Sequence, residues 1–208
     1  KCKDKWEVFT KPYSREELYE ATQISQLWIT NKTTSIEKVK AISSIIQQKF
    51  NQQNGQPKAE LLLQSPLVQY KTLSAKPTEK LWCGIYAQMI SFFCWSQNIT
   101  TRYIEIINPY NSDHHVINEC YIPELGKWVM IDATLNYLTV QDSRGNLLDL
   151  QSFRKELKLN GKIFVTRSTV PTKPCLIDTQ DKALNLYYLP ENTYNYHLNK
   201  QPGNVFLY

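Results

Sequence analysis

The chain has 208 residues, of which 42% are hydrophobic and 21% charged, and its formal net charge is +5. This length fits one globular domain or a small core with extensions, and the composition excludes wholesale disorder, collagen and coiled coil. The basic residues are scattered rather than gathered on one face, which argues against nucleic-acid binding. No apolar run reaches the roughly 18 residues of a transmembrane helix, so we expect none in this chain.

Two helices are predicted near the N-terminus. Residues 14–17 (SREE) and 34–37 (TSIE) each form a capping box, in which a hydroxyl and a glutamate satisfy the exposed backbone N–H groups. Apolar residues follow both boxes at helical spacing. We therefore expect helices over about 15–29 and 36–50, with a polar loop over 51–58.

The next segment, residues 81–95, reads LWCGIYAQMISFFCW. It is too apolar for a surface helix and too long for an ordinary strand, so it predicts a buried helix with Cys83 in its first turn. Residues 101–107, 114–122 and 128–131 are rich in β-branched side chains and alternate in polarity. We expect a hairpin from the last two, joined by residues 123–127, with the first as a neighbouring strand.

The C-terminal part carries weaker signals. A turn is expected at 142–146, a short helix over 152–159 and a strand over 161–167. The last forty residues are rich in tyrosine, which favours short edge strands.

The five cysteines are an odd number for internal pairing, and no Cys-x-x-Cys pair occurs. With three histidines, two of them adjacent, the chain offers no framework for structural zinc. We expect metal-free and cofactor-free chemistry. Cys94 lies within the apolar helical segment and is interpreted as a core residue.

Three residues provide the parts of thiol catalysis: Cys83 at the head of a buried helix, a histidine at 114 or 115, and Asp132 after the following strand. The positive end of a helix dipole and a nearby imidazolium both stabilise a thiolate nucleophile. The histidine later protonates the leaving amine, and a third group must fix its tautomer and orientation.

Two sequence blocks resemble the transglutaminase-like core. Residues 113–121 (DHHVINECY) and 126–134 (GKWVMIDAT) are similar to that family's His-Ala-Trp-x-Glu-x-Tyr, turn, Gly-x-Trp and Asp-Pro-Thr. Upstream, residues 81–88 (LWCGIYAQ) resemble its Cys helix, and residues 101–103 (TRY) resemble the start of the next strand. The resemblance covers about residues 70–140, with the blocks in the family's order.

The resemblance implies Cys83 as nucleophile, His115 as general base and acid, and Asp132 as the residue that orients His115. The chain departs from the family at Ile117, where Trp is usual, and at Ala133, where Pro is usual. Neither departure removes a reacting group, although the substrate groove is expected to differ in shape.

The residues alone do not choose between the adjacent histidines, which point to opposite faces of a strand. If Ile122 pairs with Trp128, Asp132 lies opposite Asn118 and shares a face with His114. One bulge reverses that result. The family pattern selects His115 instead.

We therefore predict an α+β fold of the transglutaminase-like, papain-related kind, with a Cys helix packed on an antiparallel sheet. Residues 1–60 are expected to be a helical N-terminal part of the same domain, 61–150 the catalytic core, and 151–208 a strand-rich extension. The implied reaction is acyl chemistry at an amide through Cys83, His115 and Asp132, with hydrolysis favoured over transamidation. The alternative is a catalytically silent module that binds peptide or carbohydrate.

The expected partner is a protein or peptide substrate carrying glutamine or other amide groups. The absent initiator methionine and the amide-rich composition favour export to the periplasm, cell surface or medium. Cys2 resembles a lipid attachment point, but such signals use a small residue where this chain has Lys1.

Overall fold

The computed structural model describes residues 13–108, 110, 113–178, 180–189 and 194–198; Cys2 lies outside them. It is a mixed helical and antiparallel-sheet structure, which confirms the predicted α+β class. The helices are α2 (Arg15–Trp28), α3 (Ser35–Phe50), α4 (Ala59–Leu62), α5 (Pro66–Ala75), α6 (Cys83–Ser96) and α7 (Leu150–Lys158), with 3-10 helices η2 (Asn51–Gln53), η3 (Pro123–Leu125) and η4 (Lys182–Tyr188).

Two antiparallel sheets organise the strands. The larger sheet has the order β3-β2-β1-β7, and the smaller has the order β4-β5-β6. The strands are β1 (Thr101–Ile107), β2 (His114–Ile122), β3 (Lys127–Ile131), β4 (Thr139–Gln141), β5 (Phe164–Arg167), β6 (Val170–Leu176) and β7 (Tyr194–Leu198). β7 is thus an edge strand from the tyrosine-rich C-terminal part, as predicted.

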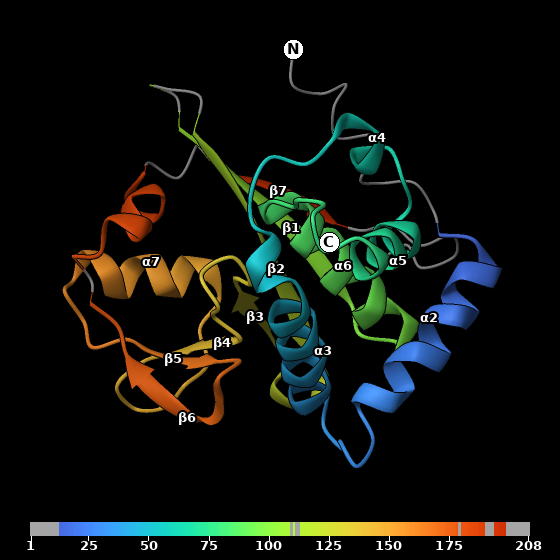
Figure 1. Ribbon diagram of the computed structural model, residues 1–208. Helices are drawn as coiled ribbons and strands as arrows, with labels where there is room; N and C mark the ends of the chain where they lie inside the picture. The colour runs from blue at the N-terminus through green and yellow to red at the C-terminus, as the bar shows by residue number, and fades with distance from the viewer. Residues whose placement is uncertain (1–12, 109, 111–112, 179, 190–193, 199–208) are drawn as a thin grey trace.

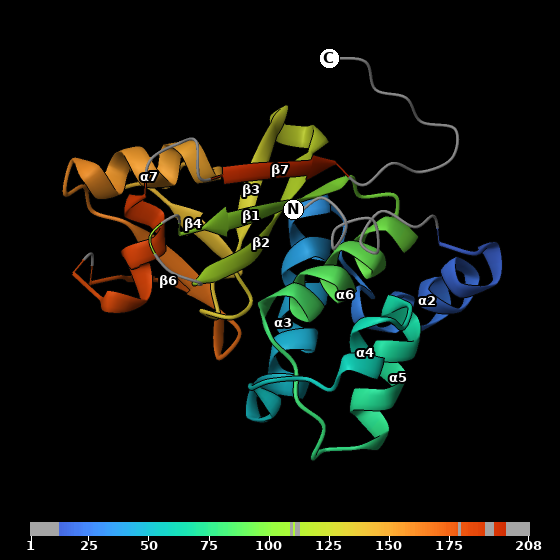
Figure 2. The same ribbon diagram turned by 90° about the horizontal axis from the view of Figure 1, so that it is seen from above.

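The larger sheet separates two layers (Figures 1 and 2). Helices α2, α3, α5 and α6 cover one face, whereas α7, η4 and the small sheet lie on the other side. Each face has its own hydrophobic core, because successive residues of a strand point to opposite faces. Val129 and Ile131 of β3 belong to the helical core, and Met130 between them belongs to the other.

Aromatic side chains join the helices of the first layer. Phe93 of α6 is fully buried, with its ring 4.7 Å from Trp28 of α2 and 5.1 Å from Tyr70 of α5. Both predicted capping boxes are present, at Ser14 and Thr34. The sequence analysis did not predict α5, which Ser65 caps by accepting a hydrogen bond from the backbone of Val68.

A buried carboxylate attaches the second layer to the sheet. Glu119 of β2 accepts a hydrogen bond from the backbone N–H of Leu150 at 2.7 Å, at the first residue of α7. Its other oxygen pairs with Arg102 at 2.5 Å, and the Arg102 guanidinium lies over the Trp128 ring. Glu119 therefore has a structural function that the motif alone does not reveal.

The hairpin between β2 and β3 is one residue shorter than the naive pairing assumed. Ile122 pairs with Lys127, and Asn118 pairs with Ile131. The single 3-10 turn of η3 ends at Gly126, whose φ of 61° lies in the left-handed region that glycine adopts without strain. The pairing of Ile122 with Trp128 was therefore wrong, and every β3 side chain lies on the opposite face from that expectation.

Candidate active site

Cys83 is the first residue of α6 and lies beside the sheet. Its half-buried side chain packs against Ala87, Tyr103 and Val116, so it contacts both α6 and the first two strands. A hydrogen bond of 3.1 Å from Asn118 Nδ2 to the carbonyl oxygen of Ala87 fastens α6 to β2 one turn further along. The helix start thereby has a fixed position relative to the strand that carries the histidines.

The corrected hairpin register brings His115 and Asp132 onto one face. Continuing the β2–β3 pairing by one residue places Asp132 opposite Ile117, two residues from His115 on the same side of β2. The backbone of Asp132 then leaves the sheet and exchanges two hydrogen bonds with Tyr137, at 2.9 and 2.7 Å. Asp132 is thus held at a fixed position just beyond the strand end.

The two side chains form a buried hydrogen bond, in which the Nε2–H of His115 donates to Oδ2 of Asp132 at 2.7 Å. The Cys83 side chain lies close enough to the same imidazole to contribute to raising the pKa of His115. Because Nε2 faces the carboxylate, Nδ1 is the ring nitrogen left to exchange a proton with Cys83. The structure therefore brings together all three residues that the sequence singled out.

Charge balance at the site favours a protonated imidazole. Burial by itself would lower the pKa of His115, but the Asp132 carboxylate, with a smaller contribution from Cys83, raises it to about 10. Burial would likewise raise the pKa of Asp132, and the facing His115 charge and hydrogen bonds from His115, Tyr187 and Leu135 lower it instead. The pair consequently holds an imidazolium against a carboxylate in a site nearly closed to water.

A residue that sequence analysis missed also contacts this carboxylate. The hydroxyl of Tyr187, in η4, donates to Oδ2 of Asp132 at 2.6 Å. Tyr187 is fully buried, with its ring edge-on to His115 at 6.2 Å between centroids. It stands 55 residues after Asp132 in a tyrosine-rich stretch, where no local signal distinguishes it from its neighbours.

His114 and two glutamines upstream of Cys83 have contacts other than Asp132. His114 is exposed, and its ring lies 6.1 Å from that of Trp82. Gln64 accepts a hydrogen bond from Thr72, and the buried Gln69 donates to the carbonyl oxygen of Leu61. The backbone N–H of Cys83, the first residue of α6, is a candidate donor for a developing oxyanion.

The remaining cysteines and possible metal ligands lie elsewhere. Cys94 is fully buried in the helical core, as predicted, and all four cysteines in the described part of the chain are free. Among those same residues, no group of three or more His, Cys, Asp and Glu could hold a metal ion. Likewise, no helix of the described segments is both long and apolar enough to cross a membrane.

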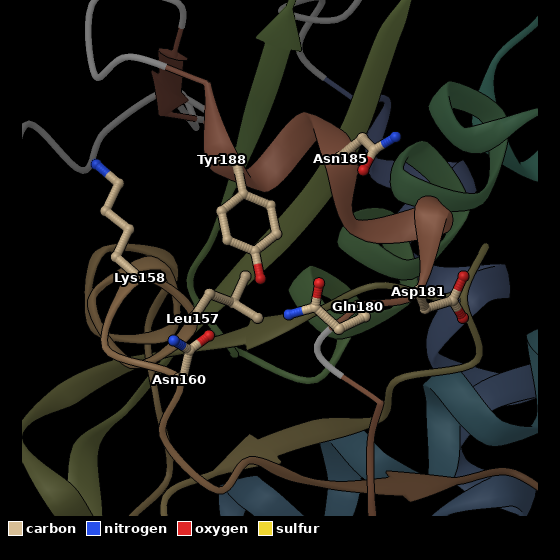
Figure 3. A pocket seen from close by; sticks show the side chains of 7 residues that line it. All are labelled: Leu157, Lys158, Asn160, Gln180, Asp181, Asn185 and Tyr188. Atoms are coloured by element: carbon tan, nitrogen blue, oxygen red, sulfur yellow. The ribbon is translucent and has the colours of Figure 1, made fainter.

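A surface pocket of about 300 Å³ lies between α7 and η4 (Figure 3), and its lining includes none of Cys83, His115 and Asp132. Tyr188 points its ring into this pocket, above Leu157 and Asn160. The neighbouring Tyr187 instead reaches inward to Asp132. The two faces of η4 therefore line different regions, and this pocket is separate from the candidate active site.

Comparison with known proteins gives limited similarity. No protein-family model matches the chain, and no curated protein matches it. Among solved structures, a candidate cysteine protease from Cytophaga hutchinsonii is 22% identical over 61% of this chain, with a TM-score of 0.42. A candidate protease from Parabacteroides distasonis is 13% identical over 79% of the chain, with a TM-score of 0.39. The similarity spans 40% and 30% of those two proteins, respectively.

Proposed function

We propose that this chain is a thiol-dependent enzyme acting at amide bonds, with Cys83 as nucleophile, His115 as proton carrier and Asp132 as the residue that orients His115. The observation that carries this proposal is the 2.7 Å hydrogen bond from His115 Nε2 to Asp132 Oδ2. Because Nε2 is bound to the carboxylate, Nδ1 of the same ring is left for Cys83. Acyl transfer through sulfur requires a thiolate next to an imidazolium that is in turn held by a carboxylate.

The reaction begins with attack of the Cys83 thiolate on the amide carbonyl carbon. The carbonyl oxygen then carries the negative charge, which the backbone N–H at the start of α6 stabilises. Collapse of this intermediate breaks the C–N bond, and the imidazolium of His115 gives its proton to the leaving nitrogen. The products of this half-reaction are a thioester on Cys83 and a free amine or ammonia.

Water resolves the thioester in the second half-reaction. The now neutral His115 takes a proton from the water as its oxygen attacks the thioester carbon, and the C–S bond breaks. A carboxylic acid leaves and the thiolate–imidazolium pair is restored. An amine in place of water would give transamidation by the same steps, and we propose hydrolysis as the principal outcome.

A defined peptide mixture tests the proposal. Peptides with internal glutamines are incubated with the protein, with and without methylamine, and the products are identified by mass spectrometry. Peptide-bond cleavage, conversion of glutamine to glutamate, and methylamine incorporation identify hydrolysis of the chain, deamidation and transamidation, respectively. We expect products that disappear in Cys83→Ala and persist in Cys175→Ala, since Cys175 is a comparably half-buried thiol on β6.

Two results would contradict this function. Products that form equally with Cys83→Ala would assign the activity to another group. Retention of unmodified peptides on the wild-type protein, without any product, would favour a binding module on the same fold.

A further inference from the structure

The carboxylate of Asp132 has more hydrogen-bond donors than a histidine partner alone would supply. Its Oδ2 accepts from both His115 Nε2, at 2.7 Å, and the Tyr187 hydroxyl, at 2.6 Å. Its Oδ1 accepts from the backbone N–H of Leu135 at 3.1 Å. Donors on both oxygens fix the rotation of a carboxylate, and bonds to an ionised acceptor are the strong ones.

Tyr187 itself is fixed by the second layer of the fold. Its ring packs edge-on against Phe153 of α7, with centroids 5.1 Å apart. The neighbouring Arg154, which is buried, donates from Nε to the carbonyl oxygen of Tyr187 at 3.2 Å and also donates to that of Leu189. Side chain and backbone of Tyr187 are therefore both held by α7.

The support continues back to the strand that carries His115. The backbone of Leu150, which begins α7, donates to Glu119 of β2, four residues after His115. A continuous set of contacts thus runs from β2 through α7 and η4 to Oδ2 of Asp132. The last group in this set is the Tyr187 hydroxyl, which has no exposed surface. Water therefore cannot take its place as a donor to Asp132, and its removal would leave the buried carboxylate short of one hydrogen bond.

We propose that Tyr187 is a positioning residue of this site: its hydroxyl holds Oδ2 of Asp132 where His115 Nε2 can donate to it, and thereby aims Nδ1 at Cys83. This inference rests on the proposed function and adds a fourth residue to it, from a region that the sequence analysis left without a role at the site. Tyr187 acts through Asp132, to which its hydroxyl donates.

The test compares Tyr187→Phe with Tyr86→Phe. The control removes a buried hydroxyl that has no hydrogen-bond partner among the described residues and lies on α6. Two quantities are measured: the proton NMR signal of His115 Nε2–H in protein labelled with ¹⁵N-histidine, and the rate at which iodoacetamide alkylates Cys83.

In Tyr187→Phe we expect the Nε2–H signal to broaden through faster exchange, and alkylation to slow by about tenfold, as for loss of one hydrogen bond to a charged group. Tyr86→Phe should match the wild type in both. Introducing 3-fluorotyrosine at position 187 keeps ring and hydroxyl, so the Nε2–H signal should stay as narrow as in the wild type and Cys83 should be alkylated at the wild-type rate. Because its hydroxyl is a stronger donor, it should also shift the Nε2–H resonance relative to the wild type, which tests the inference even if Tyr187→Phe fails to fold.

The outcomes separate this inference from the proposed function. If His115→Ala leaves Cys83 alkylation unchanged in the otherwise wild-type chain, the proposed function itself fails. If His115→Ala slows alkylation but Tyr187→Phe and the fluorotyrosine variant both leave the Nε2–H signal at its wild-type position and width, Tyr187 has no positioning role.

Discussion

His114 and His115 are chemically identical neighbours that the fold places in different environments. The side chain of His114 is exposed beside Trp82, whereas that of His115 is buried against Asp132. Strand alternation explains why the two differ, but only the register of the hairpin decides which one meets the carboxylate. The resemblance to a family selected His115, which is the histidine that contacts Asp132, whereas the pairing of Ile122 with Trp128 placed Asp132 on the face of His114.

The buried pair makes stability depend on pH in a defined window. The pKa of His115 is raised from 6.5 to about 10, so its contribution is complete below pH 6.5 and is lost as pH rises toward 10. The pKa of Asp132 is lowered from 3.8, so its contribution is complete above that pH and is lost as pH falls. Both contributions are therefore present together between pH 3.8 and 6.5.

Urea unfolding at a series of pH values tests this window by comparing the wild type with His115→Gln. The wild type should exceed the variant in free energy of unfolding by the largest margin between pH 3.8 and 6.5, and the margin should shrink toward pH 10. A margin that stays constant up to pH 10 would show that the imidazole is not held protonated by Asp132.

At the scale of elements, α6 serves both the core and the site. Its first residue is Cys83, and its last turns carry the aromatic side chains that join α2 and α5. The apolar run predicted this burial, because a helix that is hydrophobic on all sides must be covered on all sides. The position of Cys83 therefore depends on packing at the other end of the same helix.

Truncating Phe93 tests the packing of α6. Phe93→Ala should lower the free energy of unfolding by about 3–5 kcal/mol, since it removes a fully buried ring between Trp28 and Tyr70. Leu27→Ala on α2 is the matched control: its side chain is 78% exposed, and surface substitutions usually stay within about 0.5 kcal/mol. Similar losses for the two variants would contradict the described packing.

The elements differ in how readily the sequence predicts them. Helices α2 and α3 carry capping boxes followed by apolar stripes, and their bounds were predicted to within one or two residues. By contrast, α5 has few buried residues and therefore no amphipathic stripe that would mark it as a helix. Its N-terminus carries a single serine cap instead of a capping box. The helix predicted over 152–159 begins two residues earlier, at Leu150, because the Asp149 side chain caps it by accepting a hydrogen bond from the backbone N–H of Ser152.

For the whole molecule, the candidate site depends on parts that are distant in sequence. Cys83, His115 and Asp132 lie in the segment that resembles a known family, so that resemblance was enough to single them out as candidates. Tyr187 reaches the same carboxylate only because α7 and η4 fold against the far face of the sheet. Such a contact depends on tertiary packing between cores, and no local pattern in the sequence encodes it.

The proposed function requires that Cys83 and His115 form a thiolate–imidazolium pair, and iodoacetamide alkylation of each cysteine in the folded protein as a function of pH tests this pair. The products are located by mass spectrometry, with His115→Ala compared at every pH. We predict that Cys83 alone reacts rapidly near pH ~6, where an ordinary thiol with a pKa near ~8.5 is almost wholly protonated, and that the variant loses this reactivity. If Cys83 is unreactive, or if it reacts with the same pH dependence in the wild type and in His115→Ala, Cys83 and His115 do not form a thiolate–imidazolium pair.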